Sequence, residues 1–286
     1  MITPELAALA LLTWAPEASA APVEAPSVET VQAESQSPPQ PPAASAAGGD
    51  ADLATQLANP VSSLISVPFQ FNYDCCFGPE DASRYTLNIQ PVIPFKLSPD
   101  LSLVVRTIIP VIDQEATTEG SSGQFGFGDF TQTFFFSPPS RNGLTWAVGP
   151  AFLWPVGTDG LSSGKWAAGP SALVLRQQSG TTIGFLANHL WSYAGDSDRN
   201  DISATFLQPF LSHTWPSTTG VTLNMEASYD WHAEEWTVPV NLGVSHIYSF
   251  GTQKVQMGIF GRAYLDAPEG GPDWGVRFVM TLLIPD

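Results

Sequence analysis

The stretch Ile65–Tyr73 reads ISVPFQFNY, and apolar and polar positions alternate along it. Its apolar positions are Ile65, Val67, Phe69, Phe71 and Tyr73. Because successive side chains of a strand point to opposite faces, this alternation predicts a β-strand with one apolar and one polar face. The stretch Trp274–Ile284 (WGVRFVMTLLI) repeats the pattern, with Arg277 and Thr281 on the polar face. The chain is therefore expected to be rich in two-faced strands.

Further alternating stretches lie at residues 85–97, 221–229 and 236–245. Several of the predicted strands run for ten residues or more, and a tilted strand needs about nine to eleven residues to cross a bilayer. No run of about eighteen apolar residues is present, so the sequence offers no transmembrane helix. These features predict an all-β fold, a transmembrane antiparallel up-and-down β-barrel of about twelve strands, over residues 58–286.

The connections between the predicted strands alternate in length and charge. The short ones are residues 98–100, 137–143, 178–180, 216–220 and 251–252. The longer ones carry most of the carboxylates, namely Asp74, Glu80, Asp81, Asp113, Glu115, Glu119, Asp159, Asp196, Asp198, Asp201, Glu234, Glu235, Asp266, Glu269 and Asp273. Short periplasmic turns and longer external loops are typical of outer-membrane barrels, and an even strand number leaves both ends of the barrel on the periplasmic side.

Aromatic residues collect near the predicted strand ends. The tryptophans concerned are Trp154, Trp166, Trp191, Trp215, Trp231, Trp236 and Trp274. Tryptophan is enriched at both membrane interfaces because its ring is amphipathic, so these residues are interpreted as interface aromatics. The alternative is that they are core tryptophans.

Proline recurs inside the predicted strands. The positions are Pro68, Pro91, Pro110, Pro150, Pro170, Pro209 and Pro239. Because proline has no N–H to donate to a neighbouring strand, we expect bulges or kinks at these sites.

The N-terminal region predicts export. Leu6–Trp14 is a short apolar run, and Ala18–Ala20 (ASA) fits a signal-peptide cleavage site, so residues 1–20 are predicted to be a signal peptide. Glu5 stands where a basic residue is typical, and we therefore expect the true start codon to lie upstream. Residues 21–57 are rich in Pro and Ala and are predicted to be a disordered linker, either a tether to peptidoglycan or a partner, or an inert spacer.

Composition excludes some classes of protein. The net charge is −17 with only 10 Lys and Arg, which argues against a nucleic-acid partner. The 2 cysteines, Cys75 and Cys76, are adjacent, which excludes a disulfide-rich scaffold. They are interpreted either as a strained vicinal disulfide or as a loop without a redox role. The acidic loops either gather cations or are simply solvated, and no calcium-loop motif is present, so no metal site and no cofactor are predicted.

The candidate lumen residues are the charges on the polar face. Arg262 and Arg277 flank the connection around Glu269, and an antiparallel register centred there places them nearly opposite each other. Glu226, Asp129 and Arg106 are predicted to complete a network with them, and Lys96 is predicted to lie nearer the periplasm. Two interpretations remain: a constriction that selects solutes by charge, or a salt-bridge network that fills a narrow barrel.

A hydrolase would need a nucleophile beside a base. His189 lies close in sequence to Asn188 and Ser192, but in a strand His189 and Ser192 point to opposite faces. No H-E-x-x-H motif occurs. We expect that the chain is not an enzyme and that His189 is an interfacial residue.

Four blocks of the chain carry a resemblance to a known family. They are residues 149–177 (GPAFLWPVGTDGLSSGKWAAGPSALVLRQ), 185–215 (FLANHLWSYAGDSDRNDISATFLQPFLSHTW), 228–248 (SYDWHAEEWTVPVNLGVSHIY) and 271–278 (GPDWGVRF). The sequence from about residue 57 to 286 resembles bacterial outer-membrane barrels labelled "transporter" or "neuromedin U", which are close to the putative barrels of the phenol-degradation meta-pathway. The resemblance implies a barrel and an exported location, but no known substrate. The chain departs from the aromatic C-terminal residue common in outer-membrane strands, since it ends in Ile284, Pro285 and Asp286.

These observations predict a protein of the bacterial outer membrane. The predicted function is a channel or facilitated-diffusion transporter for small solutes, with hydrophobic or aromatic solutes among the candidates. The alternatives are a non-transporting structural or adhesive barrel and an outer-membrane lipid hydrolase. The expected partners are membrane lipid, lipopolysaccharide and a small-molecule solute. The sequence leaves open the solute, the oligomeric state and whether the lumen is open.

Overall fold

The structure is a computed structural model that describes residues 46–284, with side chains from residue 49 onward. The predicted signal peptide and most of the predicted linker lie outside these residues. Within the described chain there is one helix, α1 (Ala46–Leu57), followed by strands. Among the described residues, no helix is long and apolar enough to cross a membrane.

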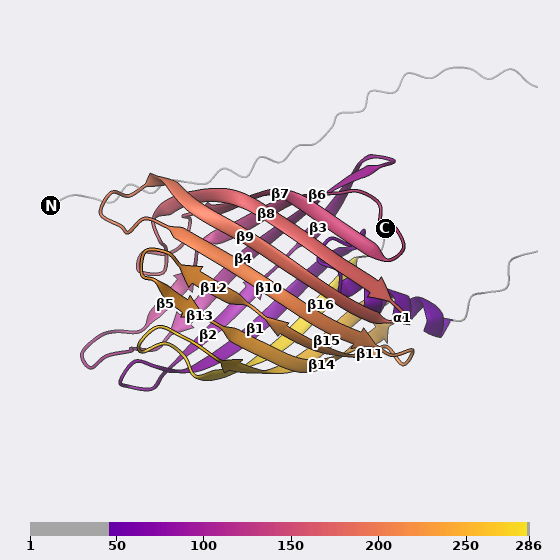
Figure 1. Cartoon of the computed structure of the whole chain (residues 1–286). Helices are drawn as coiled ribbons and strands as arrows, with labels where there is room; N and C mark the ends of the chain where they lie inside the picture. Colours follow the sequence, from indigo (N-terminus) through magenta and orange to yellow (C-terminus); the bar gives the residue numbers. More distant parts are fainter. Residues whose placement is uncertain (1–45, 285–286) are drawn as a thin grey trace, which may run out of the picture. The chain divides into compact units, whose positions relative to one another are not determined.

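The strands form one antiparallel sheet (Figure 1). They are β1 (Ile65–Phe77), β2 (Ala82–Ile89), β3 (Val92–Ser98), β4 (Leu101–Gln114), β5 (Gln124–Phe127), β6 (Phe130–Ser137), β7 (Leu144–Trp154), β8 (Lys165–Gln178), β9 (Thr181–Gly195), β10 (Ser203–Thr214), β11 (Thr219–Met225), β12 (Ala227–Asp230), β13 (Glu235–Thr237), β14 (Pro239–Phe250), β15 (Gln253–Tyr264) and β16 (Trp274–Ile284). Strands that are adjacent in the sheet pair antiparallel, and β16 pairs with β1, so the sheet closes on itself. The fold is a closed twelve-stranded barrel, because β2 with β3, β5 with β6, β11 with β12 and β13 with β14 each form one interrupted barrel strand.

The prolines account for three of the four interruptions, and they act on the neighbouring strand. The gap between β2 and β3 lies beside Pro68 of β1, whose carbonyl accepts from the Gln90 N–H. The gap between β5 and β6 lies beside Pro110 of β4. The gap between β11 and β12 lies beside Pro209 of β10, where neither β11 nor β12 is paired with β10. Since proline has no N–H, the opposing carbonyl has no donor, and the partner strand breaks there. Most of the proline-bearing strands themselves continue.

The remaining prolines act in two ways. Pro91 lies in the gap between β2 and β3, and Pro239 begins β14 after the gap that follows β13. Pro150 and Pro170 face each other between β7 and β8, and at these residues neither strand is paired with its other neighbour. The expected irregularities at proline are therefore present, and at three sites they fall on the adjacent strand rather than on the strand that carries the proline.

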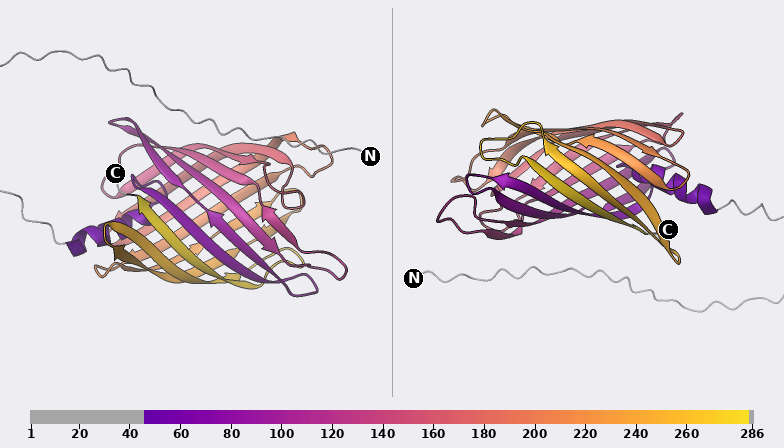
Figure 2. Two further views of the ribbon diagram at one scale, coloured as in Figure 1. Left: turned by 180° about the vertical axis from the view of Figure 1, so that it is seen from behind. Right: turned by 90° about the horizontal axis from the view of Figure 1, so that it is seen from below.

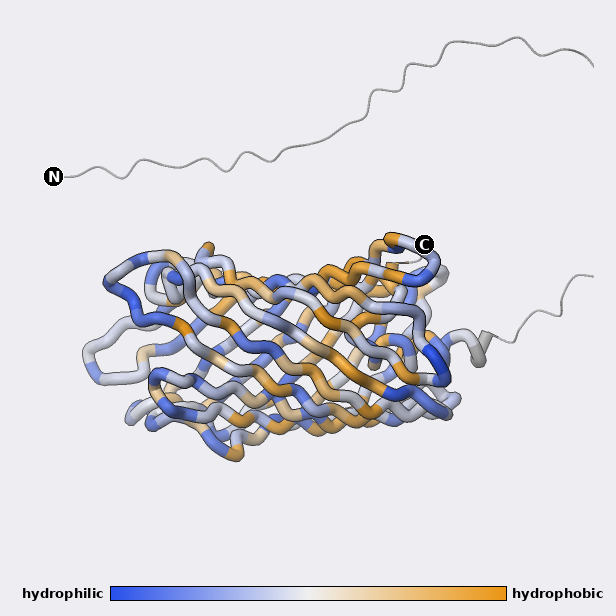
Figure 3. The backbone as a smooth tube through the Cα atoms, turned by 45° about the horizontal axis from the view of Figure 1, so that its top comes forward, coloured by the Kyte–Doolittle hydropathy of each residue, from blue (hydrophilic) through white to orange (hydrophobic). Residues whose placement is uncertain are grey.

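The barrel is apolar outside and polar inside. On β1, Phe71 faces outward and is 43% exposed, whereas Asn72 and Asp74 are buried in the lumen. On β16, Trp274, Val276 and Phe278 are exposed, and Arg277 is buried. Hydrophobic residues are spread along the wall, and hydrophilic residues gather at the connections (Figure 3). A soluble sheet protein buries its apolar face instead, so this inverted arrangement is that of a barrel in lipid.

The two ends of the barrel differ. The turns after β3, β6, β8, β10 and β14 are short, and they lie at the end of the barrel where α1 packs and where β16 finishes (Figures 1 and 2). The longer connections lie at the opposite end. This asymmetry identifies the α1 end as periplasmic and the opposite end as external.

The predicted interface tryptophans lie near these ends. Trp166, Trp191, Trp215, Trp231, Trp236 and Trp274 are exposed on the outer face, as interface residues should be. Trp215 is at the periplasmic end and the others are at the external end. Trp154 is only partly exposed and its ring packs 5.3 Å from that of Trp166. The core interpretation therefore does not apply to the six exposed residues.

Helix α1 lies within the segment predicted to be disordered, and it packs against the periplasmic end of the barrel. Ala54 is buried in a cluster with Ile247 and Leu283, against which Leu53 and Leu57 also pack. The composition of residues 21–57 as a whole predicts disorder, but this short stretch has apolar residues that the barrel buries. The average composition of residues 21–57 hides these few apolar residues.

Candidate functional site in the barrel lumen

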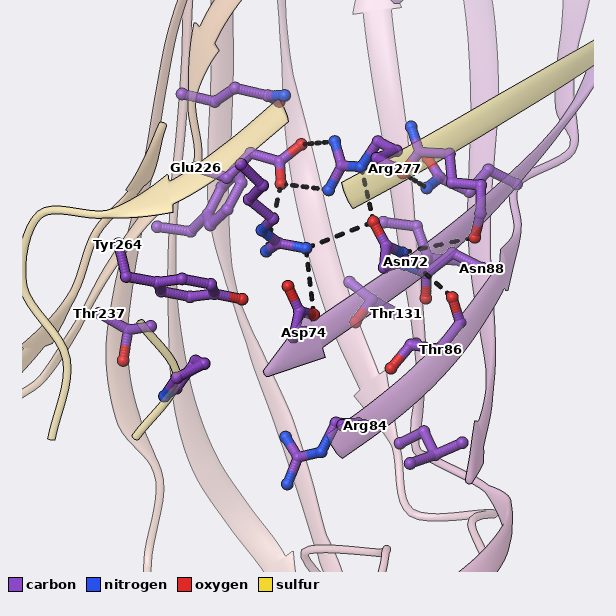
Figure 4. A pocket seen from close by; sticks show the side chains of 18 of the residues that line it. Asn72, Asp74, Arg84, Thr86, Asn88, Thr131, Glu226, Thr237, Tyr264 and Arg277 are labelled. Carbon is purple, nitrogen blue, oxygen red and sulfur yellow. Dashed lines mark hydrogen bonds and ion pairs between the residues drawn. The ribbon is translucent and has the colours of Figure 1, made fainter. Parts of the chain in front are cut away.

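The charged side chains of the lumen come from strands that are distant in sequence. Asn72 and Asp74 lie on β1, Arg277 on β16, Arg262 on β15, and Glu226 at the interruption between β11 and β12. The four strand residues occupy inward positions of their alternating strands. The closure of β16 onto β1 then brings the first and last strands of the barrel together at this site (Figure 4).

Arg277 and Glu226 form the central pair. The two Nη atoms of Arg277 donate to the two carboxylate oxygens of Glu226 at 2.8 and 2.7 Å. The Nε of Arg277 donates to Asn72 Oδ1 at 2.6 Å. The paired, two-bond geometry is the strong form of an arginine–carboxylate contact. The exposed fraction of the Arg277 side chain is 5%, so this guanidinium is fully held by protein groups.

Arg262 is bound more loosely. Its Nη1 lies 3.4 Å from Asp74 Oδ2 and 3.3 Å from Asn72 Oδ1, and its Nη2 lies 3.8 Å from Glu226 Oε2. Its guanidinium also lies 5.1 Å from the centre of the Tyr264 ring. Within the described chain, Arg262 Nε and Asp74 Oδ1 are buried without a hydrogen-bond partner. The network is therefore incomplete on the side of Arg262.

The register confirms the predicted closeness of Arg262 and Arg277. Arg262 pairs with Gly275 and Arg277 pairs with Phe260, so the two arginines are diagonal neighbours on one face. Gly275 is also opposite Asp74 of β1. A Cβ atom at position 275 would lie 2.4 Å from the Tyr73 carbonyl oxygen and 2.5 Å from Asp74 Oδ1. Glycine is thus required there for Asp74 to reach Arg262.

Replacing Gly275 by alanine is expected to displace Asp74 and to destabilise the barrel by about 1–3 kcal/mol, the usual effect of overpacking. The free energy of unfolding in urea, measured on protein reconstituted in vesicles, tests this. Gly261→Ala on the neighbouring β15 is the matched control, because a Cβ there meets nothing within 4 Å. Equal stability of the two variants would contradict the assigned role of Gly275.

A second polar layer lies deeper in the lumen. Arg106 on β4 donates from Nη2 to Gln90 Oε1 at 2.8 Å, and Gln90 donates to Gln70 Oε1 at 2.8 Å. Together with Gln208, these residues line two cavities at once. The outer cavity has a volume of about 640 Å³ and the inner one about 220 Å³. Side chains, rather than backbone, separate the two cavities along the lumen.

The inner cavity is bounded at the periplasmic end by α1 and the residues after it. Ala54, Leu57 and Asn59 line it. Polar contacts hold α1 to the wall: Lys254 Nζ lies 2.8 Å from Asp50 Oδ2, and Gln177 Nε2 donates to the Thr55 carbonyl at 2.6 Å. A helix, and not only the barrel wall, thus borders the lumen at this end.

Two of the residues predicted for the lumen network lie elsewhere. Asp129 lies at the gap between β5 and β6, where its carboxylate accepts from Ser163 N at 2.7 Å and Gly157 N at 3.2 Å. It anchors the external loop between β7 and β8 because the chain leaves the strand at that gap. Lys96 is exposed near the periplasmic end of β3 and lines neither cavity. Asp129 was expected to complete the charged network, and that prediction was wrong, whereas Lys96 was expected nearer the periplasm and lies there.

Sequence reasoning missed several positions that line the outer cavity. Asp74 was assigned to an acidic external loop, but it lies in β1 and is 5% exposed. Arg84 of β2 and Asn72 of β1 also line the outer cavity. The available signal was the alternation of β1 itself, since extending it by one step from Asn72 places Asp74 on the same inward face.

The candidate hydrolase residues do not face each other. His189 Nδ1 is 2.7 Å from Thr205 Oγ1, and its ring lies 4.0 Å from that of Trp191 on the outer face. Ser192 Oγ instead donates to Asp201 Oδ1 at 3.2 Å. Lys165 also contacts Asp201, and its hydrogen bond and positive charge lower the pKa of that loop carboxyl.

Cys75 and Cys76, at the external end of β1, form a vicinal disulfide. Of the two interpretations, the vicinal disulfide is therefore the one present. No group of three or more His, Cys, Asp or Glu side chains in the described part of the chain is arranged to hold a metal ion.

A closed antiparallel barrel with an apolar outer face and a charged lumen is a transmembrane β-barrel, and it lies in the bacterial outer membrane. Among solved structures, the chain is similar to the COG4313 outer-membrane channel from Pseudomonas putida F1, with 10% identity and a TM-score of 0.61, covering 77% of this chain and 96% of that one. It also matches outer-membrane phospholipase A from Escherichia coli, with 13% identity and a TM-score of 0.46 over 81% and 98% of the two chains. No family model and no curated protein matches the sequence. The likeness establishes the fold, and the narrower family resemblance remains a prediction.

Proposed function

We propose that this chain is an outer-membrane channel or facilitated-diffusion transporter for small solutes. The observation that carries the proposal is the division of the lumen: two cavities lie along it, and only side chains such as Arg106 and Gln90 stand between them. Side chains change rotamer far more readily than a sheet opens. The similarity of the fold to that of a solved outer-membrane channel supports this function.

The charged layer is suited to select among solutes. Arg262 and Arg277 line the outer cavity, and a charged constriction with low-dielectric walls concentrates ions of opposite sign. We therefore assign the selective step to the layer between Arg262 and Arg106.

Single-channel recordings of the full chain in planar bilayers test the proposal. We expect small conductance steps, and a shift of the reversal potential toward cation selectivity when Arg262 and Arg277 are both replaced by alanine. Arg176→Ala is the control, because Arg176 is exposed on the outer face of β8. An absence of conductance in both the native chain and the double variant would reject the channel function.

We also propose that the chain is not an enzyme. His189 is hydrogen-bonded to Thr205, while Ser192 is engaged by Asp201 and the Ile202 N–H, so neither is poised to activate the other. Purified protein should therefore release no fatty acid from phospholipid vesicles. Turnover that disappears in His189→Ala would overturn this assignment.

A further inference from the structure

The outer cavity has two chemically different sides. Its apolar side is formed by Ile108, Phe135, Leu186, Leu190 and Phe206. Four of its charged side chains lie on β1, β2, β15 and β16, across the barrel from β9 and β10 in the order of the strands. Of the other two, Arg106 lies on β4 and Glu226 lies between β11 and β12. The volume of about 640 Å³ is within the range of about 300–1,000 Å³ typical of small-molecule sites. The cavity therefore matches a ligand with one charged end and one apolar end.

The charges that line the cavity do not cancel. The lining includes four guanidinium groups and two carboxylates, on Arg84, Arg106, Arg262, Arg277, Asp74 and Glu226. Glu226 is bound to Arg277, and Asp74 faces Arg262. Within the described residues, Arg84 and Arg106 form no ion pair. A cation removed from bulk water without a counterion is unfavourable, so the cavity favours an anion.

Arg106 is the arginine best placed to hold that anion. It lies at the floor of the outer cavity, and its only side-chain partner in the described chain is Gln90, which leaves most of its donors free. On β6, Thr133 is its direct cross-strand partner, and Phe135 is two residues further on the same face. Phe135 belongs to an apolar cluster with Leu186, against which Phe206 packs. The free guanidinium and the apolar surface thus adjoin.

Arg84 lies near the external mouth of the same cavity. Its Nε donates to Gln114 Oε1, and its guanidinium lies 4.5 Å from the centre of the Phe77 ring. Arg84 is opposite Gln114 on β4, whereas Arg106 lies eight residues nearer the periplasm on that strand. The two unpaired arginines therefore stand at opposite ends of the cavity and favour inward movement of an anion from mouth to floor.

We propose that the outer cavity is a binding site for a small organic anion with an apolar body, whose carboxylate contacts Arg106 and whose body packs on Ile108, Leu190 and Phe206. The inference rests on the proposed function, because it names the class of solute that the channel would accept. The binding site itself is testable without any measurement of transport.

The test is isothermal titration calorimetry of the full chain in nonionic detergent at low salt, with benzoate, benzyl alcohol and acetate as probes. Benzoate should bind at least about tenfold more tightly than either, because only benzoate satisfies both sides of the cavity. Arg106→Gln should weaken benzoate binding about tenfold or more and leave benzyl alcohol unchanged. Arg176→Gln, on the outer face, should change neither.

Equal affinity for benzoate and benzyl alcohol, or unchanged benzoate affinity in Arg106→Gln, would overturn the inference. If Arg106→Gln does not fold, as judged by heat-modifiable migration on gels, Phe206→Ala provides the second variant, and its benzoate affinity should fall to that of acetate. Benzoate binding without any conductance would reject the channel and keep the site. Conductance without benzoate binding would reject the site and keep the channel.

Discussion

Replacing Glu226 by glutamine is expected to destabilise the folded barrel by about 3 kcal/mol, the largest effect of any single substitution in the lumen. Glu226 accepts both Nη donors of Arg277 and also lies 3.8 Å from Arg262. Removing its charge leaves two buried guanidiniums with only Asp74 between them. The effect should lie at the lower end of the range for broken buried pairs, because the adjoining cavity admits water.

Equilibrium unfolding in urea, followed by tryptophan fluorescence of vesicle-reconstituted protein, measures this loss. Glu269→Gln, in the exposed loop between β15 and β16, is the matched control and should change stability by no more than about 0.5 kcal/mol. The double variant Glu226→Gln with Arg277→Gln should be more stable than the sum of the two single effects predicts, since it leaves no unpaired charge from this pair. Additive effects would mean that Glu226 and Arg277 are not energetically coupled.

The barrel was predictable because its signal is local. The alternation in Ile65–Tyr73 and Trp274–Ile284 assigns each side chain to a face without knowledge of the partner strand. For the same reason, Arg277, Arg262 and Glu226 could be assigned to the lumen from sequence, and the structure brings all three together. Arg106 was also correctly assigned inward, although it lies in a deeper layer than Arg277.

What the sequence could not supply depends on where strands stop. Asp129 was taken as inward, but the strand breaks at that residue, and the break is caused by Pro110 on another strand. Asp74 was assigned to a loop because β1 ends later than its composition suggests. The fit of α1 to the barrel depends on Ile247 and Leu283, which are far away in sequence. These features arise from pairing between distant segments, which no local pattern encodes.

Deleting α1, residues 46–57, is expected to raise the conductance of the channel severalfold, because α1 and the residues after it bound the inner cavity at the periplasmic end. The helix is held by a small apolar contact and a few polar ones, and Asp50 and Lys254 are both partly exposed. A partly exposed ion pair contributes about 1 kcal/mol or less. Asp50→Asn should therefore increase the fraction of open channels by no more than about fivefold, an effect between those of the native chain and the deletion.

Single-channel recording shows whether α1 or the layer of side chains above it limits the conductance. Deletion of residues 24–35 removes the same number of residues but leaves α1 in place, and it should not change the conductance. If the deletion of α1 leaves conductance at the native level, the barrier lies in the side-chain layer of Arg106 and Gln90 instead, since that layer is the remaining obstruction between the two cavities. In that case Arg106→Gln, rather than the loss of α1, should increase the current. The two variants thus assign the rate-limiting constriction to one of two levels of the lumen.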